Sequence, residues 1–142
     1  MSLPDRIPVS TIMTTQVVVL NTADSLEKAE RLFKKHHIRH IPVIESHNRI
    51  VGMLSLTDLL RISFADGAYE DEEEVETVVY EMFSLPQVMA KNIKTVTPDT
   101  TIKEVAELLA REEFHALPIV EEANLVGIVT TTDLIKYLLN QY

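Results

Sequence analysis

The stretch VGMLSLTDLL at residues 51–60 decides the fold, because it recurs in the same chain as VGIVTTTDLI at residues 126–135. Each copy is an apolar run that ends in hydroxyl side chains and one carboxylate, and it then resumes as an apolar pattern with helical spacing. The chain has 3 glycines, and Gly52 and Gly127 hold equivalent places in the two copies. Such a recurrence indicates that one supersecondary unit is repeated.

The repeat extends well beyond this stretch. Met13 and Met89 are 76 positions apart, as are Pro42 and Pro118, whereas the repeated glycines are 75 apart, so the second copy lacks one loop residue. We therefore divide the chain into a first repeat (9–64), an acidic amphipathic linker (65–84) and a second repeat (85–142).

Hydrophobic spacing predicts the order β-α-β-β-α in each repeat. In the first repeat we expect a buried strand at 17–20, a helix at 25–36, strands at 41–44 and 50–54, and a helix at 57–63. In the second repeat we expect strands at 93–96, 117–120 and 125–129, a helix that starts near Thr101 and a closing helix at 132–139. Because neither copy alone covers both faces of its sheet, we predict an α/β (α+β) fold. Its two repeats pack sheet to sheet around a pseudo-twofold axis, with the helices outside and two equivalent clefts.

Composition excludes several classes of function. The net charge of −9 argues against binding to nucleic acid or to an anionic membrane surface. No apolar run approaches the ~20 residues of a membrane span, and no signal sequence begins the chain. The chain has no cysteine, which excludes disulfides and thiolate chemistry and fits a cytoplasmic location.

Two interpretations of the linker remain open. Its acidic run at 70–74 is followed by apolar residues at helical spacing, from Val75 to Phe83. This pattern is typical of a solvated amphipathic helix, and it also fits a surface for a second copy or another protein. A metal site is disfavoured, because consecutive acids lack the spaced ligands of a calcium loop.

The repeated Ser/Thr-x-x-Asp has a structural and a functional interpretation. As a capping box it would simply stabilise the start of a helix. Alternatively, hydroxyls and free N–H groups at a helix N-terminus favour an anion, and a nearby carboxylate can accept hydrogen bonds from vicinal ribose hydroxyls. The second combination suits a nucleotide.

An ordered series of motifs surrounds this element: Met89, TVTPD at 95–99, ALPIV at 116–120 and VGIVTTTDL at 126–134. The series resembles the cystathionine-β-synthase (CBS) domain, and the pair of copies resembles the tandem known as a Bateman module. The resemblance implies a regulatory, non-enzymatic module that binds adenosyl compounds such as AMP, ADP, ATP or S-adenosylmethionine in clefts between the repeats. The resemblance also implies that the module forms a homodimer, acts on a regulated partner protein of unknown identity and requires no cofactor.

The resemblance implies ligand contacts at thirteen positions. Thr57 with Asp58, and Thr132 with Asp133, would hold ribose hydroxyls beside Ser55 and Thr130. The other positions are backbone that faces adenine (Val17, Val18, Ile93 and Lys94) and side chains near phosphate (Arg39, His40 and His115). Because Ala116 replaces a basic residue in the second copy, we expect the two sites to differ in phosphate preference, with a monophosphate or an uncharged tail easier to accommodate than a triphosphate.

Other chemistry is disfavoured. A metal site from His36, His37 and His40 lacks a carboxylate or cysteine at ligand spacing. The sequence has no glycine-rich phosphate loop, nucleophile elbow or metalloprotease motif. Two hypotheses therefore remain: an adenosyl-binding regulatory module, and a ligand-free scaffold in which the hydroxyl–Asp pairs are only helix caps.

Overall fold

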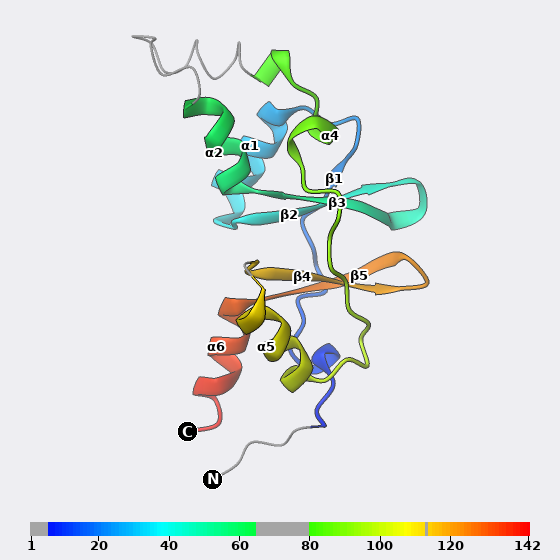
Figure 1. The fold of residues 1–142 in the computed structure, drawn as a ribbon, viewed down its shortest axis with the longest axis vertical. Helices are drawn as coiled ribbons and strands as arrows, with labels where there is room; N and C mark the ends of the chain where they lie inside the picture. The colour runs from blue at the N-terminus through cyan, green and yellow to red at the C-terminus, as the bar shows by residue number, and fades with distance from the viewer. Residues whose placement is uncertain (1–5, 65–79, 113) are drawn as a thin grey trace. The chain divides into compact units, whose positions relative to one another are not determined.

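The computed structural model describes residues 6–64, 80–112 and 114–142, and the linker helix expected over 75–83 falls largely outside them. The chain divides into two compact units (Figure 1). One consists of residues 18–93 and is called the central unit. The other combines residues 1–17 with residues 94–142 and is called the terminal unit.

The central unit has a three-stranded sheet in the order β1-β2-β3, with β1 parallel to β2 and β3 antiparallel to it. Helices α1, α2 and α4 lie on one side of these strands (Figure 1). The elements are β1 (Leu20–Asn21), α1 (Leu26–His36), β2 (His40–Glu45), β3 (Arg49–Ser55), α2 (Leu56–Phe64) and α4 (Leu85–Val88).

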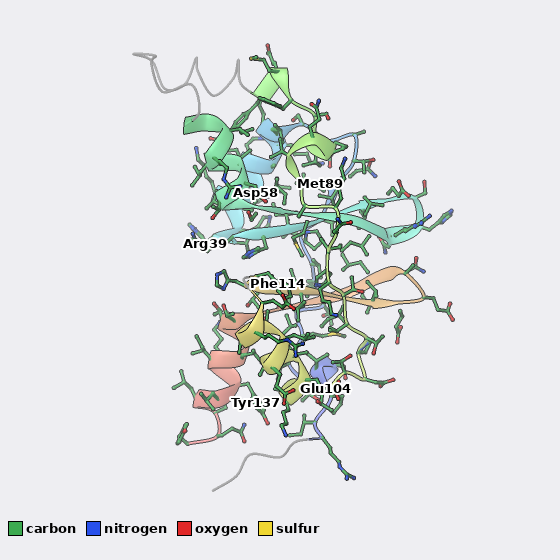
Figure 2. The ribbon with its side chains drawn as sticks, viewed as in Figure 1. Arg39, Asp58, Met89, Glu104, Phe114 and Tyr137 are labelled. Carbon is green, nitrogen blue, oxygen red and sulfur yellow. The ribbon has the colours of Figure 1, made fainter. Side chains whose placement is uncertain are left out.

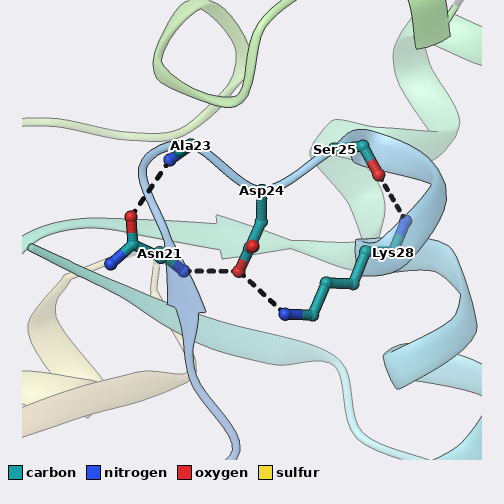
Figure 3. Close-up of polar contacts among 5 residues, drawn as sticks. All are labelled: Asn21, Ala23, Asp24, Ser25 and Lys28. Carbon is teal, nitrogen blue, oxygen red and sulfur yellow. Dashed lines mark hydrogen bonds and ion pairs between the residues drawn. The ribbon is translucent and has the colours of Figure 1, made fainter.

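The apolar face of α1 builds the core of the central unit. Ser25 caps the helix by accepting from the N–H of Lys28 at 3.1 Å, and Asp24 adds contacts to Lys28 and to the N–H of Asn21 (Figure 3). The predicted face is buried at Leu26 and Phe33, which join the apolar residues of both longer strands and of α2. The helix expected from Ser25 to His36 is therefore confirmed.

The terminal unit repeats the antiparallel pair and the two helices. Strands β4 (Ala116–Glu121) and β5 (Asn124–Thr130) pair with each other, and α5 (Ile102–Arg111) and α6 (Thr131–Leu139) lie on one side of them (Figure 1). A 3₁₀ turn at Val9–Thr11 contributes a fully buried Val9 to the core. The α+β class and the repeated strand–strand–helix order are confirmed.

The first strand of each repeat was predicted too long. Strand β1 is only Leu20–Asn21, and the expected strand at 93–96 is reduced to one parallel bridge between Val96 and Ile119. Val17, Val18 and Val19 are half-buried rather than fully buried. The prolines explain this shortness, since a proline has no N–H to donate to a neighbouring strand.

The pairing pattern fits this explanation. In the terminal unit, Val96 receives a hydrogen bond from Val120 at 2.8 Å and donates to the Pro118 carbonyl at 3.1 Å. In the central unit, β1 pairs with β2 only at Val43 and Ile44, just after Pro42. The sequence-based expectation of an edge or strand-start position for Pro42 was wrong, since Pro42 lies inside β2, between β1 and β3; its missing N–H is tolerated because β1 pairs with β2 only from Val43 onward.

Each unit contains a short segment that comes from the other repeat of the sequence. Thr14 exchanges two backbone hydrogen bonds with Ile128 of β5, at 2.9 and 3.0 Å. Ala90 exchanges two with Met53 of β3, at 2.9 and 3.0 Å. The preceding methionine, Met13 or Met89, packs against the glycine of the strand, where a Cβ would lie 2.7 or 2.6 Å from the thioether sulfur. The repeated glycines thus serve a close approach, since neither has a positive φ.

Candidate functional site

The point where β3 meets α2 gathers five of the predicted site residues in the central unit. The N–H of Leu56, the first residue of α2, donates to the Arg39 carbonyl at 2.9 Å, and His40 lies opposite Ser55 in the β2–β3 register. Arg39 and Thr57 are exposed, whereas His40, Ser55 and Asp58 are half-buried. Figure 2 labels Arg39 and Asp58. We call this cluster the central turn.

Asp58 of the central turn has an open carboxylate. Its N–H donates to the Ser55 hydroxyl at 3.0 Å, so Ser55 acts as an N-cap. Its Oδ1 lies 3.7 Å from Nη1 of Arg61, one helical turn away, in an ion pair whose cationic side chain is 74% exposed. Among the described residues, no donor forms a hydrogen bond with this carboxylate.

The point where β5 meets α6 repeats the arrangement in the terminal unit. The N–H of Thr131 donates to the His115 carbonyl at 3.0 Å, and Ala116 lies opposite Thr130 in the β4–β5 register. Exposed His115 therefore stands where Arg39 stands in the other unit. We call this cluster the terminal turn, and it includes the predicted residues His115, Thr130, Thr132 and Asp133.

The terminal turn contains a complete capping box. Oδ2 of Asp133 accepts from the N–H of Thr130 at 2.9 Å and from its hydroxyl at 3.2 Å, and the Thr130 hydroxyl accepts from the N–H of Asp133 at 3.2 Å. The structural interpretation of Ser/Thr-x-x-Asp is thus confirmed in this unit. In the central turn only one half of the box forms.

Four predicted residues lie outside both turns. Val17 and Val18 are half-buried, as is Ile93, while Lys94 is exposed. The division between the units passes between Val17 and Val18 and again between Ile93 and Lys94. All four residues therefore lie in the segments that connect one unit with the other, and their expected contact with adenine stays a prediction.

Sequence reasoning missed one charged neighbour of the site. Arg61 lies beside Asp58, and its counterpart in the second copy is Lys136. The signal was present, because residues three apart on a helix face the same side and can pair.

The chemistry available at each turn is that of recognition. A helix N-terminus attracts negative charge, and a carboxylate accepts hydrogen bonds from hydroxyls. Across residues 6–64, 80–112 and 114–142, no group of His, Cys, Asp or Glu side chains could hold a metal ion. Within the same ranges, no helix is both long and apolar enough to cross a bilayer.

Comparison with known proteins places this geometry in context. Two stretches of the chain, residues 9–65 and 85–140, match the family described as CBS domain. The CBS domain-containing protein YhcV of Bacillus subtilis is 32% identical over 122 residues, which are 86% of this chain and 79% of that protein.

Two solved structures that contain adenosyl ligands share the fold. CBSX2 in complex with AMP has a TM-score of 0.79 and 23% identity, over 95% of this chain and 98% of that chain. The CBS domain pair of protein MJ0100, in complex with 5′-methylthioadenosine and S-adenosyl-L-methionine, has a TM-score of 0.80 and 21% identity, over 98% of this chain and 100% of that chain.

Some relatives are much longer than this chain. It is 29% identical over 131 residues to the uncharacterized protein MJ1225 of Methanocaldococcus jannaschii, and the match covers 92% of this chain but 42% of that protein. It also matches a homoserine O-acetyltransferase of Methanohalobium evestigatum at 24% identity, over 92% of this chain and 24% of the enzyme.

Proposed function

This chain belongs to the CBS domain family, and from that premise we propose that it is a regulatory module that binds an adenosyl compound. The observation that carries the proposal is the repeated turn: twice, a strand delivers a hydroxyl and a carboxylate to a helix N-terminus, beside an exposed basic residue. The ligands printed for CBSX2 and MJ0100 support it as chemistry that this fold accommodates.

The proposed contacts follow the chemistry of the ligand. At the central turn, the ribose hydroxyls donate to Asp58 beside Ser55 and Thr57, and a phosphate lies near Arg39 and His40. The equivalent contacts at the terminal turn come from Thr130, Thr132, Asp133 and His115. The backbone near Val17, Val18, Ile93 and Lys94 is the proposed platform for adenine.

We also propose that the module has no reaction of its own, needs no cofactor and acts in the cytoplasm. The hydroxyls of Ser55 and Thr130, beside the two carboxylates, each accept from a backbone N–H as helix caps, which supports a role in structure and recognition rather than in nucleophilic attack. A chain without cysteine fits a reducing compartment.

A second copy of the chain is the proposed partner of α6. Ile135, Leu138 and Leu139 are 57, 43 and 65% exposed, and their spacing of i, i+3 and i+4 puts them on one face of the helix. An exposed apolar face of this kind marks an interface. In a homodimer, a ligand that prefers one arrangement of the copies would shift the populations, and the regulated protein would detect that shift.

The dimer is tested by light scattering after gel filtration. Ile135→Asp with Leu139→Asp is expected to give the monomer mass, while Asn124→Asp, at an exposed position of β5, keeps the dimer mass. A dimer that survives the double substitution would exclude this face as the interface.

A ligand-free scaffold is the alternative, and the capping box of the terminal turn favours it, since that box accounts for the motif without any ligand. Thermal melting with AMP, ADP, ATP, S-adenosylmethionine and NADH separates the two functions. A ligand at 100 times its Kd adds about 2.7 kcal/mol, which for this chain length is on the order of 8 °C in Tm. Equal melting temperatures with every compound would refute ligand binding and support the scaffold.

A further inference from the structure

The two repeated aspartates differ in what their carboxylates already contact. Oδ2 of Asp133 accepts two hydrogen bonds from Thr130, at 2.9 and 3.2 Å. Asp58 forms no such bond in the described residues, and its nearest cation is Arg61 at 3.7 Å. The motif is the same in both repeats, yet the Asp133 carboxylate accepts hydrogen bonds from the N-cap residue of its own helix, whereas the Asp58 carboxylate accepts none from Ser55.

From this difference we propose that the two turns divide their roles: the central turn is the high-affinity adenosyl site, and Asp133 of the terminal turn acts mainly as a helix cap. The inference rests on the proposed function, because it ranks the two sites at which an adenosyl compound would bind.

The first reason is the number of acceptor positions that remain. Two vicinal hydroxyls are best received by both oxygens of one carboxylate. At Asp133 one oxygen already serves Thr130, so a bidentate pair must displace the cap or share that oxygen with it. At Asp58 both oxygens are available, because an exposed ion pair with Arg61 at 3.7 Å is weak and easily exchanged.

The second reason is the charge around each turn. Arg39 carries a planar guanidinium fork that matches a phosphate, whereas the imidazole of its counterpart His115 cannot offer two parallel donors in that geometry. His40 of the central turn is replaced by Ala116, so the terminal turn has fewer polar contacts for an anion. Both differences favour the central turn for a ligand such as AMP.

The test combines calorimetric titration of AMP with the melting temperature of the ligand-free protein, for Asp58→Ala and Asp133→Ala. Asp58→Ala should weaken AMP binding by about 10-fold to 150-fold, the range for a hydrogen bond to a charged group, and shift Tm by less than about 1 °C. Asp133→Ala should weaken AMP binding less than about threefold and lower Tm by about 3 °C, because it removes the acceptor of two hydrogen bonds from Thr130 in the capping box.

Two further variants sharpen the comparison. Asp133→Asn should recover most of the lost Tm, because its amide oxygen can still accept from Thr130. Asn124→Ala, at an exposed position of β5, should alter neither quantity. In the calorimetric titration, wild-type protein should bind one AMP per chain with high affinity.

Several outcomes would overturn the assignment. These are two equal tight sites in wild type, a loss of AMP affinity with Asp133→Ala as large as with Asp58→Ala, or equal Tm losses in the two variants. If wild-type protein binds neither AMP nor S-adenosylmethionine, the proposed function fails together with the ranking of sites. The Tm comparison then decides the cap assignment by itself.

Discussion

Replacing Gly127 with alanine should destabilise the protein through one identifiable overlap. The added Cβ would lie 2.7 Å from Sδ of Met13, 3.0 Å from the Thr14 carbonyl oxygen and 3.2 Å from Cγ of Met13. Favourable contacts between such heavy atoms lie at about 3.5–4.0 Å, so the overlap is roughly 0.5–1 Å. The thioether can rotate away, because methionine has three rotatable bonds.

The Thr14 carbonyl cannot move as easily. It accepts from the N–H of Ile128 at 3.0 Å, while the N–H of Thr14 donates to the Ile128 carbonyl at 2.9 Å. Moving the segment strains or breaks both bonds, each worth about 1 kcal/mol net. We therefore expect Gly127→Ala to cost about 1–3 kcal/mol, the range for an overpacked site, and to lower Tm by about 3–9 °C.

Urea unfolding measured by circular dichroism provides the assay, with Asn124→Ala on the same strand as the matched control. The double variant Met13→Ala with Gly127→Ala should recover no more than part of the loss, since the overlap with the carbonyl persists. A Gly127→Ala protein within 0.5 kcal/mol of wild type, a margin on the order of an ordinary surface substitution, would refute the close-approach explanation.

Three further outcomes follow from the described contacts. Thr101→Ala removes the hydroxyl that accepts from the N–H of Glu104 at 3.1 Å, and it should cost about 1 kcal/mol in urea unfolding. Leu54→Ala empties a fully buried position and should cost about 2–5 kcal/mol, whereas a loss below 1 kcal/mol would show that the central core is loosely packed. Raising NaCl to 1 M should change the stability of the ligand-free protein by less than about 1 kcal/mol, because ion pairs such as Arg49–Glu45 are solvent-exposed, and calorimetry would reveal a larger effect.

Much of the fold could be predicted because local signals and the repeat agreed. Caps at Ser25 and Thr101 marked the starts of α1 and α5, and apolar spacing marked their buried faces. The ends of the predicted first strands were wrong because a β-branched run indicates an extended backbone but not how many partners can pair with it. That number depends on Pro42 and Pro118, whose missing N–H groups leave only a short ladder.

The candidate site was predictable in composition but not in its asymmetry. The motif placed Asp58 and Asp133 at two equivalent helix starts, and the structure confirms those places. It could not indicate that Thr130 closes a full capping box while Ser55 forms half of one, because both residues are common N-caps. That difference depends on side-chain orientation, which a sequence motif does not encode.

The segments exchanged between repeats have a consequence for any attempt to halve the protein. A cut between residues 64 and 80 would leave an N-terminal fragment without the Met89–Ala90 partner of β3 and a C-terminal fragment without the Met13–Thr14 partner of β5. Each piece would therefore carry the missing part of the other, and the two should assemble on mixing rather than fold independently.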